Sequence, residues 1–356
     1  MRFIFKNEND FEVKWNNFVQ KNMNVSHVYT LNALESQKHY ARLPSNDEFS
    51  FLIEENDDVL AICPLVFQKN TENINSFSWS DYEGYIFSPS ISEKLPIKIK
   101  RSLEKKCYEK IDELARDNQV SKIMLMLDPC TNLYDFNILT KYGYLDTTIN
   151  TALLNLNKSY EEIWSGFRKS YKSIINKGLK RYTIEFYDSS NPSYEIHQNY
   201  KKMHIKTAGR QTRSDETWEL QYKMLKEDNA LIIGLLDNDK YVAFSYFYHH
   251  NKSAFYASAA DDPDFKTKDP IQHPIMWSAV KYFKKRKFNV LDIGWQYFSP
   301  QLFSLPEEKD LKISFFKRGL CNEIRPVYRG IKYLNNDLLL KEISNNLNSL
   351  YEFNKK

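Results

Sequence analysis

Glycine is scarce in this chain, which has nine glycines among 356 residues. Neither G-x-G-x-x-G nor G-x-x-x-x-G-K-[ST] occurs anywhere. This excludes the glycine-rich loops with which dinucleotide-binding folds and Walker-type nucleotide sites hold phosphate groups. The nine glycines also contain no Q/R-x-x-G-x-G/A loop, the backbone cradle that many acetyl-CoA enzymes use for the coenzyme's pyrophosphate.

Cysteine and histidine patterns typical of disulfides or metal sites are also missing. The four cysteines are scattered and form no C-x-x-C pair, at Cys63, Cys107, Cys130 and Cys321. Such spacing favours reduced thiols in a cytoplasmic protein. The histidines include one adjacent pair, His249 and His250. Neighbours on a strand point to opposite faces, so we expect no metal ion there.

Long hydrophobic segments are absent as well. The longest apolar runs, 59–67 and 230–236, fall far short of the ~20 residues that a bilayer crossing needs. The first six residues are followed by Glu8 and Asp10 instead of an apolar segment, so we expect no secretory signal. We therefore expect no integral membrane segment, while a peripheral membrane contact stays open.

What the chain does contain is enough apolar material for two cores. Hydrophobic residues make up 42% and aromatic residues 15% of its length, which excludes a disordered protein and suggests about two domains. Residues 1–150 carry 17 Lys and Arg against 22 Asp and Glu, a net charge of −5, whereas residues 151–356 carry 33 against 24, a net charge of +9. A polyanionic partner should therefore bind the second half.

The same order of elements is predicted twice. In the first half, apolar runs at 49–54 and 59–67 flank a polar turn, a helix follows Pro96 to about Asn118, and 122–127 forms a short strand. In the second half, runs at 230–236 and 241–248 flank a turn, a helix covers about 275–286, and 289–293 forms a strand. Two copies of one α/β unit explain this order most simply.

A basic amphipathic segment lies between the two halves. Residues 159–178 place apolar side chains on one helical face, and Ser159 with Glu162 forms a capping-box pattern. Seven cations against two acids lie between Lys158 and Arg181. Two interpretations of this excess remain: a phosphate-binding segment, or the solvated face of a surface helix. At the end of the chain, leucines and Ile343 are spaced as an amphipathic helix, for which we expect docking on the core over a dimer contact.

Several short motifs follow one another along the chain: YEEIWSGFRKSYKSIINK at 160–177, TAGRQTR at 207–213, the 235–247 hairpin, YASA at 256–259, PIMW at 274–277, LDIG at 291–294 and ISFFKRGL at 313–320. Together they resemble the FemABX family of aminoacyltransferases and its GNAT-like relatives in envelope glycoconjugate synthesis. The resemblance covers about residues 45–330 in element order. No long coiled-coil arm is present, as in compact FemX-like members, and Leu320-Cys321 replaces the Phe-Gly that often follows the motif.

The resemblance implies an α/β (α+β) fold of two tandem GNAT-like domains with a shared cleft, in which flanking helices cover mixed, mostly antiparallel sheets. We expect the first domain at 1–151, the second at 152–335 and the amphipathic C-terminal helix at 336–356. It also implies an acyltransferase that attaches an activated acyl group to an amino group. The developing oxyanion then needs a positive group, and the attacking ammonium must lose a proton.

Three residues are candidates for this chemistry. The resemblance assigns a functionally important lysine to Lys317, as the oxyanion or phosphate partner; the alternative is a surface lysine after a buried Phe-Phe strand. Asp262, in a turn signature, and Asp292, at a strand end before Gly294, are candidate bases.

Other residues are candidates for binding. Arg210 and Arg213 suit bidentate contacts to phosphates, or belong to an exposed loop. Tyr256 and Trp277 are candidate acceptor contacts, with core packing as the alternative. The candidates for binding tRNA or phosphate are Arg168, Lys169, Lys172, Lys177 and Arg181.

The missing coenzyme loop favours aminoacyl-tRNA as the donor, with acyl-CoA as the open alternative. The acceptor would be a sugar-nucleotide or lipid-linked envelope precursor, and no DNA partner is expected. Two other functions remain: an acyl-CoA-dependent N-acyltransferase acting on an amino sugar in surface polysaccharide synthesis, and a non-catalytic RNA- or glycan-binding module.

Overall fold

The computed structural model describes residues 1–40, 45–70, 72–79, 84–131, 134–267, 270–321 and 323–355. The chain packs as two compact units. Unit 1 consists of Met1–Asn150, Tyr297–Leu311 and Pro326–Lys356, and unit 2 of Thr151–Gln296 and Lys312–Arg325. The domain limits expected from the sequence stay a prediction, and each unit is described by itself.

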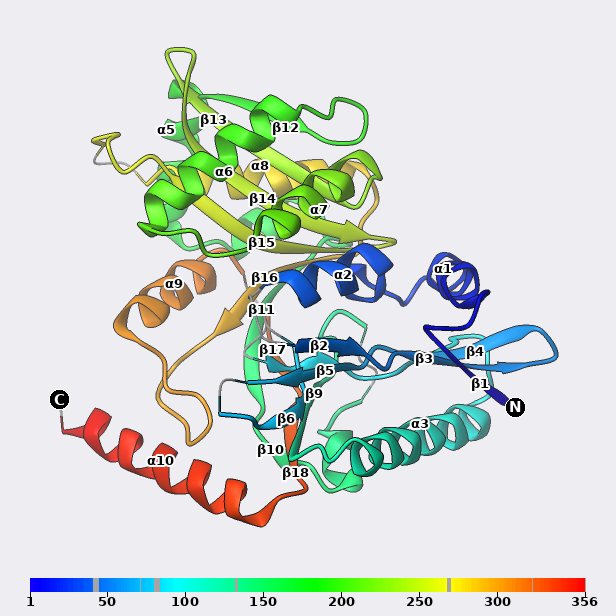
Figure 1. Cartoon of the computed structure of the whole chain (residues 1–356). Helices are drawn as coiled ribbons and strands as arrows, with labels where there is room; N and C mark the ends of the chain where they lie inside the picture. Colours follow the sequence, from blue (N-terminus) through cyan, green and yellow to red (C-terminus); the bar gives the residue numbers. More distant parts are fainter. Residues whose placement is uncertain are drawn as a thin grey trace. The chain divides into compact units, whose positions relative to one another are not determined.

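Unit 1 contains two sheets (Figure 1). One has the strand order β1-β3-β4-β8, and the other has the order β10-β18-β9-β6-β5-β2, with β7 paired to β9. The strands are β1 (Arg2–Phe5), β2 (Ser45–Glu48), β3 (Phe51–Glu55), β4 (Asp58–Cys63), β5 (Val66–Lys69), β6 (Asn75–Phe77), β7 (Ile86–Phe87), β8 (Ser90–Ile91), β9 (Lys122–Met126), β10 (Leu145–Asp146) and β18 (Arg329–Tyr333). The helices are α1 (Phe11–Lys21), η1 (His27–Tyr29), α2 (Leu31–Tyr40), α3 (Ile97–Asp117), η3 (Ile138–Tyr142) and α10 (Asn336–Asn354).

The first predicted hairpin is β3–β4, an antiparallel pair whose turn places Asn56 and Asp57 in the left-handed region at φ 51° and 65°. The apolar run 59–67, predicted as one strand, is divided into β4 and β5 by Pro64. Proline has no N–H to donate to a strand ladder, so it ends the pairing there. The predicted helix and short strand are confirmed as α3, which begins directly after Pro96, and β9.

The C-terminal helix α10 is confirmed, but its expected docking on the core holds only at its start. Leu338 is buried, whereas Leu340 and Leu347 are exposed. Polar contacts hold the first two turns: Glu342 accepts hydrogen bonds from Lys122 (2.7 Å) and from the Tyr333 hydroxyl (2.6 Å). The later turns carry their apolar side chains into solvent.

Unit 2 is built around a seven-stranded sheet of order β12-β13-β14-β15-β16-β11-β17. In Figure 1, α6 and α7 cover one face of this sheet, and α5 and α8 cover the other. The strands are β11 (Ile149–Asn155), β12 (Thr183–Tyr187), β13 (Ala230–Asp237), β14 (Lys240–His250), β15 (Ser253–Asp261), β16 (Val290–Gln296) and β17 (Glu323–Val327). The helices are α4 (Tyr160–Gly166), α5 (Lys169–Arg181), α6 (Tyr194–Ala208), α7 (Asp215–Lys226) and α8 (Gln272–Lys285), while α9 (Glu308–Arg318) begins in unit 1 and continues into unit 2 from Lys312.

The second predicted hairpin is confirmed as β13–β14. The next connection differs in kind: β15 and β16 run parallel and pair over only three residues, 253–255 against 290–292. Beyond this point no ladder joins the two strands in the described residues. The two strands therefore diverge toward their carboxyl ends. Unit 1 has an equivalent parallel connection around α3, where β7 pairs with β9.

The single packed helix predicted over 159–178 is wrong. The capping box at Ser159 is present, but the first helix, α4, ends at Gly166 and a second one, α5, starts at Lys169. Arg168 between them has an extended ψ of 135°, and its N–H donates to the carbonyl of Gly319 at 2.8 Å. A contact with a distant segment thus breaks a helix that the apolar stripe alone would continue.

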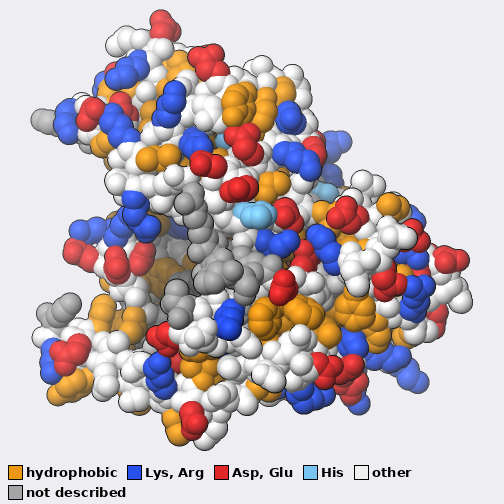
Figure 2. All heavy atoms as spheres, viewed as in Figure 1, with side chains coloured by type: hydrophobic (Ala, Val, Ile, Leu, Met, Phe, Trp, Pro, Cys, Tyr) orange, Lys and Arg blue, Asp and Glu red, His pale blue; other side chains and the backbone are white. Residues whose placement is uncertain are grey.

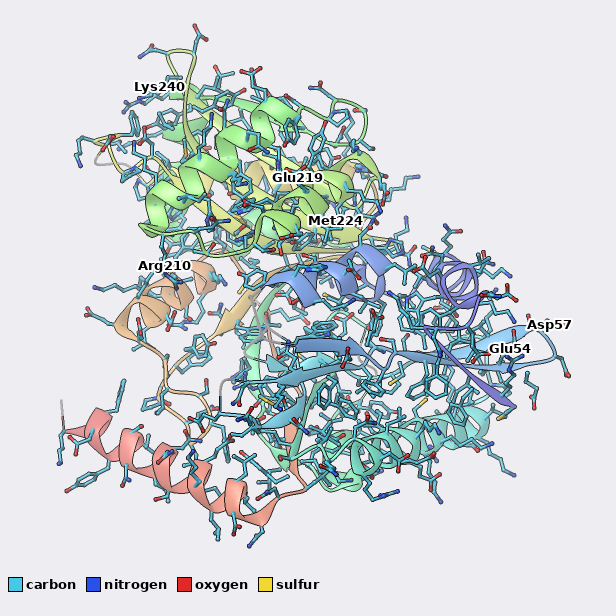
Figure 3. The ribbon with its side chains drawn as sticks, in the orientation of Figure 1. Glu54, Asp57, Arg210, Glu219, Met224 and Lys240 are labelled. Atoms are coloured by element: carbon cyan, nitrogen blue, oxygen red, sulfur yellow. The ribbon has the colours of Figure 1, made fainter. Side chains whose placement is uncertain are left out.

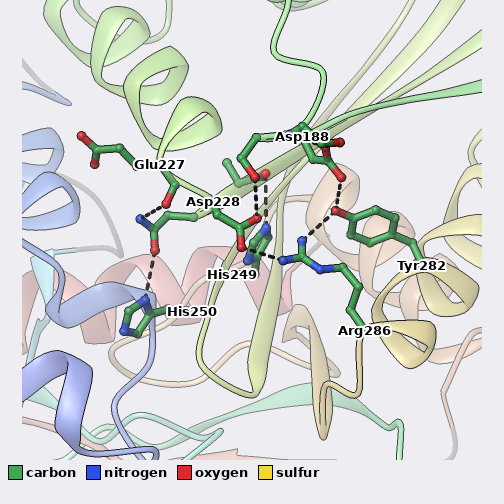
Figure 4. Close-up of polar contacts among 11 residues, drawn as sticks. Asp188, Glu227, Asp228, His249, His250, Tyr282 and Arg286 are labelled. Carbon is green, nitrogen blue, oxygen red and sulfur yellow. Dashed lines mark hydrogen bonds and ion pairs between the residues drawn. The ribbon is translucent and has the colours of Figure 1, made fainter.

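A polar clamp on the surface of unit 2 connects three segments (Figure 4). Arg286 at the end of α8 pairs with Asp228 (2.6 Å) and donates to the Tyr282 hydroxyl (2.7 Å), which in turn donates to Asp188 (2.6 Å). Asp188 follows β12, and Asp228 lies in the turn between α7 and β13. The clamp therefore joins the helix on one face of the sheet to connections at its edge.

Candidate active site

Lys317 lies in the last turn of α9, and its amine rests on the backbone of Gly294 in β16. A Cβ atom built on Gly294 would lie 2.5 Å from the Lys317 Nζ, so any side chain there would displace the amine. Gly294 also has a φ of 100°, a conformation that glycine adopts without steric cost. The fold thus brings together the LDIG and FFKRG segments, which are separate in the sequence.

Asp292 stabilises the end of β16 at Gly294. Its side chain is buried, and Oδ1 accepts hydrogen bonds from the Thr151 hydroxyl (2.6 Å) and from the Gly294 amide (2.7 Å). Both bonds hold the backbone at which Gly294 turns left-handed. This geometry favours Asp292 as a positioning residue for the Lys317 seat, and its role as a base stays a prediction.

The start of α5 packs against the turn that follows Lys317. The Arg168 guanidinium lies 3.9 Å from the ring centre of Phe315 and donates to the Tyr171 hydroxyl at 3.0 Å. A Cβ atom on Gly319 would lie 2.2 Å from the Tyr171 ring, so only glycine allows this approach. Arg168 is therefore held next to the end of α9, whose last turn contains Lys317 and Arg318.

A neutral histidine lies beneath this junction. The His273 ring is 4.2 Å from the Tyr171 ring and 4.9 Å from the Phe316 ring, in edge-to-face contacts. Burial, with the Arg168 charge as a second cause, lowers the pKa of His273 from 6.5 to about 4. Near pH 7 the ring is therefore uncharged and adds no positive charge to that of Arg168.

The remaining basic residues of the segment lie elsewhere. Lys169 and Lys172 belong to the first turn of α5, whereas Lys177 and Arg181 lie toward its other end, about 12 Å and about 18 Å from Lys169 at 1.5 Å per residue. Arg181 is in an ion pair with Asp237 at 3.1 Å. Only the first part of the predicted basic track lies near Lys317. On the face that Figure 2 shows, cations and acids intermingle.

Asp262 lies away from this group, at the end of β15. Its carboxylate pairs with Lys206 (2.6 Å) and Lys240 (3.6 Å), and Lys240 is labelled in Figure 3. The hydrogen bond from Lys206 holds the pKa of Asp262 below its usual range. A carboxylate neutralised in this way is a weaker base, so the ion pairs favour a structural role.

The two arginines of the predicted substrate loop have different surroundings. Arg210 is exposed after the end of α6 (Figure 3). Arg213 is buried, donates to the His204 Nε2 at 3.2 Å, and lies 4.5 Å from the Trp218 ring centre. Arg210 is thus accessible to a ligand from solvent, whereas Arg213 is built into the packing between α6 and α7.

Tyr256 and Trp277 both face the core of unit 2. The Trp277 ring lies 4.7 Å from the Trp164 ring and 5.6 Å from the Phe167 ring, which agrees with the core alternative. Tyr256 is buried, and burial raises the pKa of its phenol well above the usual range. A neutral phenol can donate but not accept a proton near pH 7.

Tyr256 belongs to a polar chain that the sequence analysis missed. The Ser245 hydroxyl is bonded to Tyr256 and donates to the Gln272 Oε1 at 2.6 Å, and the Gln272 amide donates to Asp261 at 2.5 Å. Burial raises the pKa of Asp261. The available signal was a serine inside the apolar strand AFSYF, since a buried hydroxyl requires a partner.

A cavity of about 260 Å³ lies in unit 1, between α1 and the β3–β4 turn. Its lining includes Lys14, Lys21 and Asp57, and none of the predicted site residues. Within the described ranges, no group of three or more His, Cys, Asp and Glu side chains is arranged to hold a metal ion. The helices of these ranges also lack the length and hydropathy needed to cross a membrane.

No protein-family model matches the sequence, and no curated protein matches it either. Solved structures do match. FemX aligns with a TM-score of 0.69 and 14% identity over 96% of this chain and 100% of its own. The chain has the fold of FemX. The predicted FemX-like, tandem GNAT-like architecture is therefore confirmed.

Two further structures share this FemX-like fold. The C-terminal domain of a putative lysylphosphatidylglycerol synthetase from Agrobacterium fabrum has a TM-score of 0.59 at 11% identity, covering 94% of this chain and 95% of its own. A tandem GNAT protein from the clavulanic acid biosynthesis pathway has a TM-score of 0.52 at 8% identity, covering 93% and 98%. At such identities the similarity establishes the fold.

Proposed function

We propose that this protein is an acyltransferase that moves an aminoacyl group from aminoacyl-tRNA to an amino group of a cell-envelope precursor. The observation that carries the proposal is the Lys317 amine seated on Gly294, where β15 and β16 have diverged. An ammonium held at this point can stabilise negative charge that appears only during reaction. The names of FemX and of lysylphosphatidylglycerol synthetase among the similar structures agree with this chemistry.

The reaction is the aminolysis of an ester. The acceptor nitrogen attacks the ester carbonyl carbon, a C–N bond forms, and the C–O bond to the ribose breaks. The carbonyl oxygen becomes negative at the tetrahedral stage, and the Lys317 ammonium is positioned to donate a hydrogen bond to it. The departing ribose oxygen takes up one proton while the attacking nitrogen loses one, so protons balance with solvent as the carrier.

The surroundings of α8 support an RNA donor over acyl-CoA. A helix N-terminus accepts phosphates through free N–H groups, but the first turn of α8 includes Pro274, which has none. The Gln272 side chain and the Asp261 carboxylate occupy the adjoining strand end. A pyrophosphate placed there would lie close to a carboxylate, and the first turn of α8 would offer it one N–H fewer because of Pro274. The cations at the start of α5 favour a polyanion instead.

Transfer from charged tRNA to an envelope precursor, detected by mass spectrometry, tests the proposal. Lys317→Ala should reduce turnover by about 10²- to 10³-fold, as for the loss of one oxyanion donor. Lys309→Ala, an exposed lysine of the same helix, is the matched control and should remain active. RNase treatment should abolish transfer. Full activity of Lys317→Ala would remove this lysine from the mechanism, and activity with acyl-CoA after RNase treatment would support the amino-sugar alternative.

A further inference from the structure

The outer side of α9 exposes a large aromatic ring. The Phe315 side chain is 56% exposed, while its neighbour Phe316 packs against Tyr171 and His273. Ile313, two residues earlier in α9, is 40% exposed. Burial of Phe315 would be favourable, and the fold makes no use of the ring as core. The ring is therefore accessible to a ligand from solvent.

The exposed ring is part of a prearranged stack. The Arg168 guanidinium lies 3.9 Å from the Phe315 ring centre, and it is fixed by hydrogen bonds to the Phe315 carbonyl (3.3 Å) and to the Tyr171 hydroxyl (3.0 Å). An arginine on a flexible surface would lose rotamer entropy on binding a ligand. Here that entropy has already been lost in the folded protein.

Positive charge surrounds this stack. Lys312 and Arg318 lie one turn before and after Phe315 on α9, and Lys169 follows Arg168. The acids of α9, Glu308 and Asp310, are confined to its first turn. A planar apolar surface framed by cations matches an unpaired nucleotide, because bases stack on aromatic and guanidinium groups while Lys and Arg contact phosphates.

We propose that Phe315 and Arg168 form a stacking site for an unpaired nucleobase in the single-stranded 3′ segment of the RNA donor. This inference rests on the proposed function. Lys317 projects from the other side of the same helical turn, roughly 10 Å away, the diameter of a helix with its side chains. Because the body of α9 lies between the two side chains, the chain from the stacked base to the ester runs around the helix, and the nucleotides that follow the stacked base carry the ester toward Lys317.

Fluorescence anisotropy with a labelled single-stranded RNA of about eight nucleotides ending in adenosine tests the site. Phe315→Ala should weaken binding by about 5- to 150-fold, the equivalent of one lost stacked base. Phe315→Trp should keep the affinity. Phe315→Leu is the matched control, because it is apolar but not aromatic, and it should bind as weakly as alanine. Wild-type affinity of either Phe315→Ala or Phe315→Leu would overturn the stacking site.

A second binding experiment distinguishes the RNA donor from a sugar-nucleotide acceptor as the source of the bound nucleobase. Uridine diphosphate is the probe for the nucleotide part of a sugar-nucleotide acceptor. If it binds in a Phe315-dependent way and competes with the RNA, the site belongs to the acceptor and the donor assignment is overturned. Failure of the proposed function is distinguishable: Phe315-dependent RNA binding without any transfer would keep this site, whereas undiminished transfer by Phe315→Ala at low donor concentration would reject it alone.

Discussion

Replacing Gly294 by alanine tests how the lysine seat works. The added Cβ atom would lie 2.5 Å from the Lys317 Nζ, where ordinary contacts begin at 3.4 Å. The amine must therefore move by about 1 Å, and a displacement of that size can cost about 10²-fold in rate. Because the obstructing atom ends a flexible side chain, the protein should accommodate the change by moving the lysine and not the strand.

Alanine at this position also carries a backbone cost. A φ of 100° is unfavourable for a residue with a side chain, and comparable left-handed conformations cost about 1–2 kcal/mol. Gly143 provides a matched control: it has a φ of 83°, and its Cβ would lie 3.6 Å from the nearest lysine carbon, of Lys332. Gly143→Ala therefore adds similar strain without a clash.

The measurements are kcat/KM for transfer and the free energy of unfolding of both variants. Both should lose about 1–2 kcal/mol of stability, and only Gly294→Ala should lose about 10²-fold in kcat/KM. If Gly294→Ala keeps full activity while its stability falls, the position of Lys317 on this backbone has no catalytic meaning. If both variants lose activity equally, strain and not lysine displacement is the cause.

Two further predictions concern the stability of unit 2. His197 is fully buried, and burial together with the charges of Lys201 and Arg213 lowers its pKa from 6.5 to about 4. Between pH 6.5 and pH 4, therefore, the unfolded chain binds a proton at this histidine and the folded protein does not. The free energy of unfolding should consequently fall by up to about 3 kcal/mol as the pH drops from 6.5 to 4. Urea unfolding at several pH values should show this slope, and an equal slope in His197→Phe would contradict it. In the clamp of Figure 4, Arg286→Met should cost about 1 kcal/mol, because the Arg286–Asp228 pair is partly exposed. Lys285→Met, an exposed neighbour, is the control, and equal Tm values for the two variants would show that the clamp adds nothing.

Local signals predicted much of the fold. Polar turns between apolar runs located both hairpins, and Asn56 and Asp57 show why, since these residue types tolerate the left-handed conformation of a tight turn. Pro96 marked the start of α3 because a proline at a helix start lacks only an N–H that would have no partner in the helix.

Tertiary contacts decided what the sequence pattern could not predict. At the break between α4 and α5 the Arg168 N–H donates to the distant Gly319 carbonyl, and the local signal for this break within 159–178 is Gly166, the last residue of α4. The same holds for the site: Lys317 was singled out by its motif, but its seat on Gly294 is a packing relation between two elements. Phe315 gave no signal, because an exposed and a buried phenylalanine look alike in a sequence.

The discontinuity of unit 1 has a consequence for synthesis on the ribosome. Strand β18 lies between β9 and β10, yet it follows all of unit 2 along the chain. Unit 2 can therefore fold before the ribosome has synthesised β18, whereas β9 and β10 of unit 1 still lack the strand that lies between them. A nonsense mutation after Val327 would leave every strand of the unit 2 sheet and deprive the other unit of an internal strand, so a short C-terminal loss should be far more damaging than its length suggests.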